Sequence, residues 1–456
     1  MYAQTRNYGD TVPIAALASG LGALALIRTS GDGSIALIAK IFSRPSALLS
    51  APGNTIVHGW IVKNGAKIDE VLVMVYRAGR SYTGEEGADI SCHGGQAATG
   101  GITAALRSAG FADALPGEFT FRAFLNGKLD LTRSESVMEM VSARTGTALD
   151  HAVKRLSGAL ETEINRNKEK VAELLSAVEL CLDYPEDEID SQEVQIEVDS
   201  IRVIADDLGR LCSAFEHERL YREGALVVIA GKPNSGKSSL FNALLHENRS
   251  IVTDSPGTTR DWIEGEFSLA GIPIRLADTA GIRDEAESEA AEQQGIIRSR
   301  ELLEEADLVL YVIDGEKGVC EEDRQQLEKK MPLIPVWNKT DIAFSGGHIK
   351  KYPALVETSA RTGQGLEELC RRIQAALDTA KTDAIPAGLG SLRQKELCEE
   401  AIGSLHAAIK MIQDGLSFEF IASGLRDALN ALGTITGEVS AADILEKMFS
   451  RFCLGK

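Results

Sequence analysis

The sequence predicts a multidomain fold in which a small α+β domain precedes an all-α helical domain that is interrupted by an inserted α/β unit. The chain has 456 residues, of which 44% are hydrophobic and 25% charged, an ordinary globular composition for about three domains. Near Gly146 short β-like runs give way to long apolar periodicities of three and four residues. The same periodicity returns after a self-contained segment in which strands and helices alternate.

The N-terminal α+β domain is predicted to span residues 1–117. Its β-like runs lie at 24–27, 55–62 and 70–76, and turn-rich joints such as Lys63-Asn64-Gly65 separate them. Helical runs are expected at 33–42 and 97–109.

Residues 118–222 and 381–456 are predicted to form two parts of one helical domain. One long amphipathic helix is expected from about residue 146 until Asp183-Tyr184-Pro185 ends it, and a second helical stretch runs from Val194 to Phe215. Apolar residues recur at the same spacing beyond Leu397. Because a helix with one apolar stripe must bury it, we expect helices from both flanks to form one bundle. Two separate helical hairpins remain the alternative.

A phosphate-binding loop opens the inserted unit, which is predicted to span residues 223–380. The sequence Gly231-Lys232-Pro233-Asn234-Ser235-Gly236-Lys237-Ser238 stands between an apolar strand and a helix, which is the setting that a Gly-x4-Gly-Lys-Ser motif requires. Its backbone N–H groups would converge on phosphate oxygens, Lys237 would add a cation, and Ser238 can ligate Mg²⁺. A Gly-rich turn without a ligand is the alternative. The motif predicts a Ras-like P-loop domain that binds a nucleoside triphosphate.

Guanine is the base that the next motifs predict. In Asn338-Lys339-Thr340-Asp341 the carboxylate of Asp341 can accept from the N1–H and the exocyclic amine of guanine, whereas adenine would leave it unpaired. Ser359-Ala360-Arg361 would supply a backbone N–H for the guanine carbonyl. Thr258-Thr259 and Asp278-Thr279-Ala280-Gly281 complete the order of motifs expected for a GTPase. Any one of these motifs alone could be a turn or a helix cap.

Hydrolysis of GTP is predicted from the same motifs. Thr259 would complete the Mg²⁺ shell with Ser238, Asp278 would hold a metal-bound water, and Gly281 would meet the γ-phosphate. Ras-like GTPases orient the attacking water with a glutamine where this chain has Ile282, which cannot do so. Candidates to replace it are Glu285, Glu287, Glu289 and Glu292, although such an acidic run is also typical of a solvated loop. Because no arginine finger is evident, positive charge in the transition state must come from elsewhere.

The residues predicted to contact GTP come from all of these segments. They are Asn234, Ser235, Gly236, Lys237, Ser238, Ser239, Thr253, Asp254, Ser255, Gly257, Thr258, Thr259, Asp278, Thr279, Ala280, Gly281, Asn338, Lys339, Asp341, Ser359, Ala360 and Arg361.

Composition limits the partners and the compartment. With 48 basic and 67 acidic residues the formal net charge is -19, so an RNA partner would have to meet a local basic surface. The 7 cysteines are scattered without a Cys-x-x-Cys pair, which argues against a disulfide framework or a zinc site. The sequence shows no signal peptide and no uncharged apolar run approaching the ~20 residues of a membrane span. We therefore expect reduced thiols and a cytoplasmic protein.

Further stretches outside the inserted unit make the sequence similar to bacterial tRNA modification GTPases of the MnmE (TrmE) family. The resemblance covers most of the chain. Its motifs are Ser81-Tyr82-Thr83-Gly84-Glu85, His93-Gly94-Gly95, Pro116-Gly117-Glu118-Phe119-Thr120, the run at 122–131, Gly257-Thr258-Thr259-Arg260-Asp261, and the terminal Phe452-Cys453-Leu454-Gly455-Lys456.

The resemblance implies a folate-binding-like N-terminal domain that dimerises. That domain would hold 5,10-methylene- or 5-formyl-tetrahydrofolate as one-carbon donor, with contacts from Arg28, Glu85, Lys128 and Lys456. Arg and Lys suit the folate carboxylates, and Glu85 suits the N–H donors of the pterin. Each of the four could instead be a surface charge. The chain departs from the family at residues 15–22, where a Thr, a Pro and an Arg of the usual loop are missing.

The resemblance also implies how GTP is hydrolysed and what the protein serves. K⁺-dependent dimerisation of the GTPase domains would stimulate hydrolysis, with K⁺ held by Asn234 and the carbonyls of Thr253, Ser255 and Thr258, and Glu292 would orient the water. With tRNA and an FAD-binding partner, MnmG (GidA), the protein would place an aminomethyl or carboxymethylaminomethyl group on C5 of the wobble uridine. Folate would give the carbon, and glycine or ammonium the amine. Cys453 is a candidate nucleophile or a reduced structural thiol.

Two other functions stay open at this point. A regulatory GTPase switch in ribosome assembly would share the GTPase motifs, but neither a basic helix with interleaved aromatics nor a KH loop is visible in the sequence. A folate-binding scaffold whose GTPase domain only times assembly is the third option.

Overall fold

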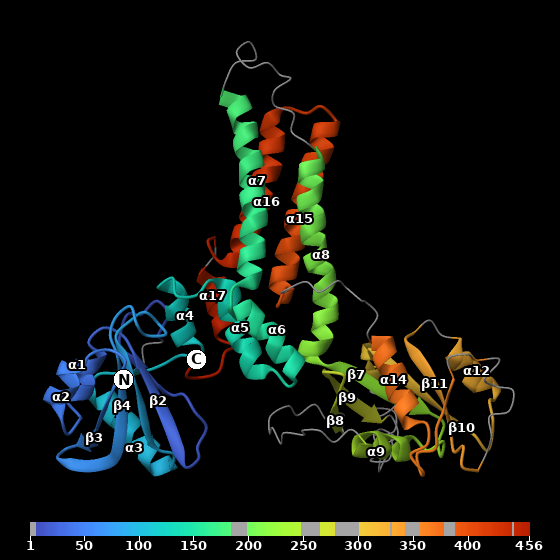
Figure 1. The fold of residues 1–456 in the computed structure, drawn as a ribbon, viewed down its shortest axis with the longest axis horizontal. Helices are drawn as coiled ribbons and strands as arrows, with labels where there is room; N and C mark the ends of the chain where they lie inside the picture. Colours follow the sequence, from blue (N-terminus) through green and yellow to red (C-terminus); the bar gives the residue numbers. More distant parts are fainter. Residues whose placement is uncertain are drawn as a thin grey trace. The chain divides into compact units, whose positions relative to one another are not determined.

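The structure is a computed structural model that describes residues 6–183, 198–247, 265–278, 301–328, 331–342, 352, 355–377, 388–439 and 442–456. The chain divides into two compact units (Figure 1). The first comprises Met1–Met138, Arg155–Leu208 and Ser391–Lys456, and the second comprises Glu139–Lys154 and Gly209–Gly390.

A six-stranded sheet organises the N-terminal part of the first unit. Its strand order is β3-β4-β5-β2-β1-β6, and only the β1–β6 pair is parallel. The elements are β1 (Ile14–Leu17), β2 (Leu24–Ser30), α1 (Ser34–Ala39), α2 (Pro45–Ser50), β3 (Thr55–Lys63), β4 (Ala66–Tyr76), β5 (Gly87–His93), α3 (Gln96–Ala109), β6 (Ala112–Asp113) and α4 (Glu118–Leu125). The α+β expectation for this part of the chain is confirmed. The helical run expected at 33–42 is shorter than predicted. Gly33 stands outside α1 at a φ of 77°, the helix ends at Ala39, and Phe42 forms a β-bridge with Ile61.

Helix α3 packs on one face of this sheet and α4 on the other, and side chains of β2 point alternately to the two faces. Ala25 and Ile27 point into a large apolar core to which α3 contributes Ile102 and Leu106. Arg28 and Ser30 therefore point to the other face. In the register of the sheet they stand opposite Ala16 and Ile14, which form a small core with Phe119 of α4. Arg28 and Ser30 thus lie on the face that α4 covers.

The C-terminal segment of the chain returns to this N-terminal part. α17 (Ala442–Phe449) packs on α4, and Phe449 and Phe452 share a core with Tyr8 and Phe121. The Phe121 and Phe449 rings meet edge to face with centroids 5.3 Å apart. The terminal residues are thereby brought next to the α4 face of the sheet.

Helices from both flanks of the inserted segment form one bundle in the first unit (Figure 1). α16 (Phe418–Thr436) packs on both α7 (Ala159–Asp183) and α15 (Leu392–Gln413). The first part of α8 (Val198–Glu223) joins them, since the Cys398 thiol of α15 lies 3.6 Å from the Leu208 carbonyl. The core of the bundle contains apolar residues of all four helices that are fully buried, among them Leu160, Ile164, Val171, Val178, Ile201, Leu208, Leu405, Leu425 and Leu432. The single bundle is confirmed, and the alternative of two separate hairpins is wrong.

The single long helix expected from residue 146 is instead two helices, so that prediction is wrong. α6 (Gly146–Leu156) ends before Gly158, whose φ of 91° lies in the left-handed region, and α7 starts at Ala159. A side chain at Gly158 would overlap the guanidinium of Arg133 on α5 (Leu131–Ser142). Leu149 and Val153 of the expected apolar stripe are 40% and 42% exposed. The apolar period continues across this break, so periodicity alone does not reveal the left-handed glycine at which α6 gives way to α7.

Glu135 of α5 binds residues at the start of α15, and so it joins the segments that precede and follow the inserted domain. Its replacement is expected to destabilise the first unit. Its carboxylate accepts from Arg393 at 2.9 and 3.1 Å, from Ser391 at 3.2 Å and from Gln394, and its side chain is 10% exposed. Glu135→Ala would leave Arg393 without its counter-charge, which costs about 3 kcal/mol for a buried pair. Denaturant unfolding followed by helical circular dichroism measures this loss.

Glu179→Ala is the matched control for that experiment. Glu179 links α7 to Arg426 of α16 at 2.6 Å, but the two side chains are 46% and 54% exposed. An exposed pair contributes less than about 1 kcal/mol. Equal losses for the two variants would contradict the role given to Glu135.

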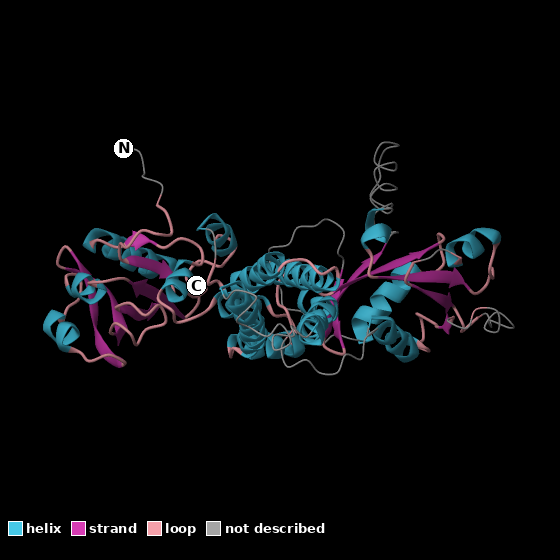
Figure 2. Cartoon of the chain, turned by 90° about the horizontal axis from the view of Figure 1, so that it is seen from above, coloured by secondary structure: helices cyan, strands magenta, loops and turns pink. Residues whose placement is uncertain are grey.

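The second unit contains a six-stranded sheet with helices beside it (Figure 2). Its order is β12-β11-β10-β7-β9-β8, and only the β8–β9 pair is antiparallel. The elements are β7 (Ala225–Gly231), α9 (Lys237–Glu247), β8 (Gly265–Leu269), β9 (Ile272–Asp278), β10 (Leu308–Asp314), α12 (Glu321–Leu327), β11 (Leu333–Asn338), β12 (Val356–Glu357) and α14 (Leu366–Leu377). β7 lies between β9 and β10, so the strand order reverses there and ligands are expected at the carboxyl ends of these strands. The predicted P-loop α/β fold is confirmed.

No helix within the described ranges is both long and apolar enough to cross a membrane.

Candidate functional site

The phosphate loop follows β7 and leads directly into α9. Gly231 has a φ of 147° and Gly236 a φ of 92°, and a side chain at Gly236 would overlap the amide of Asn338. Asn234 also adopts a left-handed backbone, with a φ of 65°, which asparagine tolerates better than most residues. Lys237 is buried and its ammonium donates to the Lys232 carbonyl at 2.9 Å, which curls the side chain over the loop. This arrangement can place backbone N–H groups and one cation around phosphate oxygens.

Two oxygen groups meet where the loop enters α9. The Ser238 hydroxyl donates to Oδ2 of Asp278 at 2.8 Å, and Asp278 is buried at the end of β9. A hydroxyl beside a carboxylate suits a hard cation such as Mg²⁺, which binds few protein oxygens directly and retains its waters. Ser238 would be a direct ligand and Asp278 would hold a metal-bound water. Thr259, the other predicted ligand, lies outside the described residues.

Asn338 connects the guanine motif to the phosphate loop. Its amide nitrogen donates to the Ser235 carbonyl at 3.0 Å, while its amide oxygen accepts from the backbone N–H of Ala360 at 3.1 Å. Asp341 is held in turn by the Ser359 hydroxyl, which donates to its Oδ1 at 2.8 Å. The structure therefore brings together the loops of Asn338, Asp341 and Ser359, as the sequence predicted.

Lys339 is fixed by an acidic residue that the sequence reasoning missed. Its ammonium lies 3.0 Å from Asp314 and 3.3 Å from Glu316. The hydrogen bond to Asp314 raises the pKa of the lysine above its usual value. Asp314 ends β10, so its position after a buried strand, next to the carboxyl ends of β7 and β11, was the available signal. With its head so anchored, the aliphatic stem of Lys339 can lie along a base.

The remaining predicted nucleotide and K⁺ residues lie outside the described part of the chain. They are Thr253, Asp254, Ser255, Gly257, Thr258, Thr259, Thr279, Ala280, Gly281 and Glu292. Of the predicted K⁺ ligands, Asn234 is described.

A second charged site lies on the α4 face of the N-terminal sheet, around Arg28. Its guanidinium pairs with both oxygens of Asp89 at 3.0 and 3.3 Å, and it lies 5.7 Å from the centre of the Tyr82 ring and 5.9 Å from that of Phe119. Nη1 also donates to the Gly455 carbonyl at 3.4 Å. The structure thus brings Arg28 beside the C-terminal residues, as a site shared by Arg28 and Lys456 would require.

The terminal residues also touch the loop in which the chain departs from its family. A side chain at Gly455 would press on the backbone of Ala18, just after β1. Cys453, the predicted nucleophile or structural thiol, is exposed. The altered loop is therefore part of the wall against which the terminus packs.

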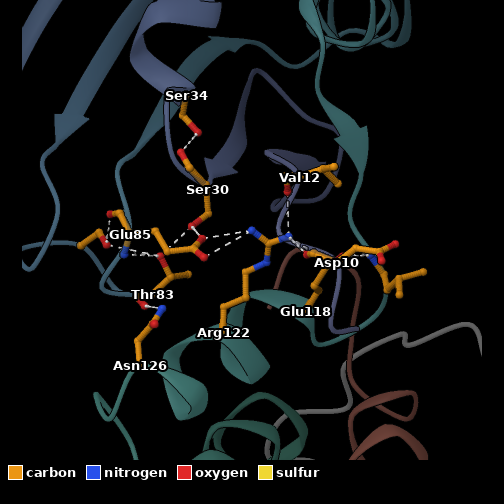
Figure 3. A network of polar contacts seen from close by, with 12 residues as sticks. Asp10, Val12, Ser30, Ser34, Thr83, Glu85, Glu118, Arg122 and Asn126 are labelled. Carbon is orange, nitrogen blue, oxygen red and sulfur yellow. Dashed lines mark hydrogen bonds and ion pairs between the residues drawn. The ribbon is translucent and has the colours of Figure 1, made fainter. Parts of the chain in front are cut away.

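Glu85 belongs to the same charged site (Figure 3). Its carboxylate accepts from the Ser30 hydroxyl at 2.7 Å and from Arg122 at 3.1 Å. Lys128 reaches the loop that carries Glu85, where its ammonium donates to the Gly79 carbonyl at 2.7 Å. Arg28 and Glu85 are thereby placed at the same face of the sheet, because Arg28 belongs to β2 and Glu85 binds Ser30 of that strand. Lys128 lies beside them through its contact with the Glu85 loop.

Arg122 and Asp89 are residues of this site that the sequence reasoning missed. Arg122 stood within a quoted motif, and a charged residue inside the apolar run Phe119–Leu125 was a signal of a buried ion pair. Its partner Glu85 is 37 residues away in the chain, and Asp89 is 61 residues from Arg28. No local pattern in the sequence links residues so far apart.

Comparison with known proteins gives full-length relatives. Residues 131–453 match the model of the MnmE helical domain, and residues 13–128 match that of the GTP-binding protein TrmE N-terminus. The tRNA modification GTPase MnmE of Treponema denticola is 41% identical over 99% of this chain and 100% of its own length. That of Carboxydothermus hydrogenoformans is 39% identical over 98% and 99%.

Among solved structures, Era in complex with MgGDPNP and 16S ribosomal RNA nucleotides is 29% identical over 40% of this chain and 66% of its own. Its TM-score against this chain is 0.27. The chain belongs to the MnmE family of tRNA modification GTPases.

Proposed function

We propose that this chain is the GTP-hydrolysing component of a complex that adds a carboxymethylaminomethyl or aminomethyl group to C5 of the wobble uridine, position 34, of certain tRNAs. The observation that supports this most is that a chain of this family carries two chemically distinct sites. One combines the phosphate loop with Ser238, Asp278 and Asp341, and the other gathers Arg28, Glu85 and the C-terminal residues. A GTPase that acted only as a switch would have no need of the second site.

At the first site the chain would bind GTP and orient it for hydrolysis. Lys237 and the loop N–H groups would hold the phosphates, Asp341 the guanine, and Ser238 with Thr259 the Mg²⁺ ion. When bound, Mg²⁺ neutralises charge that develops on the phosphate oxygens. K⁺, held by Asn234 with the carbonyls of Thr253, Ser255 and Thr258, would supply the charge that an arginine finger gives elsewhere. Glu292 would position the attacking water.

At the second site the chain would bind a tetrahydrofolate derivative as the one-carbon donor. Arg28, Lys128 and Lys456 offer cations for its carboxylates, and Glu85 offers a carboxylate for the N–H donors of its pterin. The geometry fits such a ligand because Arg28 and Glu85 are 22% and 23% exposed, so each is anchored by the protein while part of it faces solvent. Tyr82, 39% exposed beside Arg28, adds an aromatic face.

The complex would contain further partners in the cytoplasm. We propose a homodimer that joins an FAD-binding MnmG partner and acts on tRNA. Cys453, exposed near Lys456, would be available as a nucleophile in this complex.

Isothermal calorimetry tests the folate site directly. Wild-type protein is expected to bind 5-formyltetrahydrofolate at one site per chain, and Arg28→Gln is expected to weaken binding at least about tenfold, since a charge-assisted hydrogen bond contributes about 1.5–3 kcal/mol.

Arg107→Gln is the matched control. Arg107 also pairs with an aspartate of the N-terminal sheet, Asp113 at 2.8 Å, but it is 57% exposed and belongs to α3, which covers the face of the sheet opposite Arg28. Its affinity should equal that of the wild type. If wild-type protein gave no heat at concentrations well above the expected dissociation constant, the folate donor would be excluded.

A further inference from the structure

We propose that Arg122 is a positioning residue that fixes the carboxylate of Glu85, so that its Oε1 atom stays available to a ligand with N–H donors such as a pterin. This inference rests on the proposed folate function. It adds a residue, and a role for it, to that site.

The contacts of Glu85 divide its two oxygens into an occupied and an available one (Figure 3). Oε2 accepts from Ser30 at 2.7 Å and from Arg122 at 3.1 Å, whereas Oε1 has one long contact, 3.5 Å from the same Arg122 nitrogen. Because a carboxylate oxygen accepts about two strong hydrogen bonds, Oε2 is filled. Oε1 retains acceptor capacity for a ligand.

Arg122 itself cannot turn away from Glu85, because its other nitrogen is held from three directions. Nη2 donates to Glu118 at 2.8 Å and to the carbonyls of Asp10 and Val12 at 3.1 and 2.8 Å. The Arg122 side chain is 4% exposed. The planar guanidinium of Arg122 donates to Glu85 through Nη1 and to Glu118 through Nη2. A lysine has a single nitrogen and cannot reach both carboxylates in this geometry.

Glu118 completes the anchor behind Arg122. It is fully buried and accepts from Arg6 at 2.6 Å and from the backbone N–H of Leu115 at 2.7 Å. Charges therefore alternate from Arg6 through Glu118 and Arg122 to Glu85. The two inner members are buried, and the two end members, Arg6 and Glu85, are 19% and 23% exposed. Burying a row of charged side chains is costly unless each of them is paired with a neighbour of opposite charge. Turning Glu85 away would leave Arg122 without one of its partners, so the pairing holds Glu85 in one orientation.

The consequence is a selectivity that can be measured. A pterin presents a 2-amino group and a ring N–H that can donate to Glu85, and an analogue with a 2-methyl group in place of the amino group loses part of this interaction. A site that places Oε1 correctly should favour the amino compound by about tenfold or more. A site in which Glu85 is free to turn should lose the preference.

Calorimetry with 5-formyltetrahydrofolate and with its 2-desamino-2-methyl counterpart tests the inference. The full-length wild-type protein is expected to prefer the former, and Arg122→Lys is expected to lose most of this preference, as should Glu85→Gln. Should Arg122→Lys fold poorly, Ser30→Ala removes the other donor to Oε2 with little change in volume, and it should also reduce the preference. General damage to the fold would weaken both ligands equally and leave their ratio unchanged.

Arg77→Lys is the matched control. Arg77 pairs with the neighbouring Glu86 at 2.7 Å and donates to the carbonyls of Leu49 and Ala51, so it loses the same kinds of contact without touching Glu85. It should retain the wild-type ratio of affinities. If wild-type protein bound neither ligand, or both equally, the assignment of Glu85 to a pterin would fail and this inference with it. If Glu85→Gln abolished the preference while Arg122→Lys and Ser30→Ala kept it, the inference about Arg122 alone would be overturned.

Discussion

Asp341→Asn is expected to lower the affinity for GTP at least about a hundredfold and to make xanthosine triphosphate the preferred nucleotide. A site built to accept hydrogen bonds from guanine leaves buried groups unpaired when the acceptor becomes a donor. Xanthine replaces the exocyclic amine of guanine by a carbonyl, to which the new amide can donate. The Ser359 hydroxyl, 2.8 Å from Oδ1 of Asp341, would still orient the substituted side chain.

Direct titration of each protein with fluorescently labelled GTP and with labelled XTP measures this exchange. Wild-type protein provides the reference, since it should bind GTP tightly and XTP poorly, and the variant should do the reverse. Thermal unfolding without nucleotide should be nearly the same for both proteins, because asparagine has the shape of aspartate. A variant that kept wild-type GTP affinity would exclude Asp341 as the residue that reads guanine.

GTP turnover is expected to rise at least about tenfold when K⁺ replaces Na⁺ at equal ionic strength. Ile282 stands where Ras-like GTPases have their glutamine, and the sequence shows no arginine finger, a group that contributes roughly 10³–10⁵ to the rate elsewhere. A bound cation is the proposed substitute. Steady-state phosphate release in KCl and in NaCl measures the difference.

Asn234→Gly is the variant that separates this ion effect from general salt effects. Glycine keeps the left-handed backbone that Asn234 adopts at a φ of 65°, and removes the side-chain oxygen proposed to hold K⁺. The variant should hydrolyse GTP slowly in both salts. Equal wild-type rates in K⁺ and Na⁺ would rule out the ion mechanism.

The parts of the fold that the sequence predicted well are those with short-range signals. The phosphate loop was predictable because strand, glycines, lysine and helix are contiguous, and the structure places Ser238 beside Asp278 as those motifs imply. The bundle was predictable because apolar stripes on both flanks had to be buried, and α7 does pack on α16.

Other features depend on residues that are distant in the chain. At the break between α6 and α7, Arg133 occupies the space that a side chain at residue 158 would need, and no period in the sequence records that contact. The pairing of Arg122 with Glu85, and of Arg28 with Asp89, arises from how β2, β5 and α4 come together. Burial of Arg122 was foreseeable from its apolar neighbours, but its partner was not.

Mass spectrometry of wobble nucleosides from tRNA tests the central claim most directly. Cells lacking this protein should lack the aminomethyl and carboxymethylaminomethyl groups on C5 of uridine 34. The wild-type gene should restore them, and neither Lys237→Ala, which disables the phosphate loop, nor Glu85→Gln, which disables the proposed folate site, should do so. Unchanged wobble uridines in the deletion cells would contradict the account, and a ribosome assembly defect beside them would favour a GTPase switch.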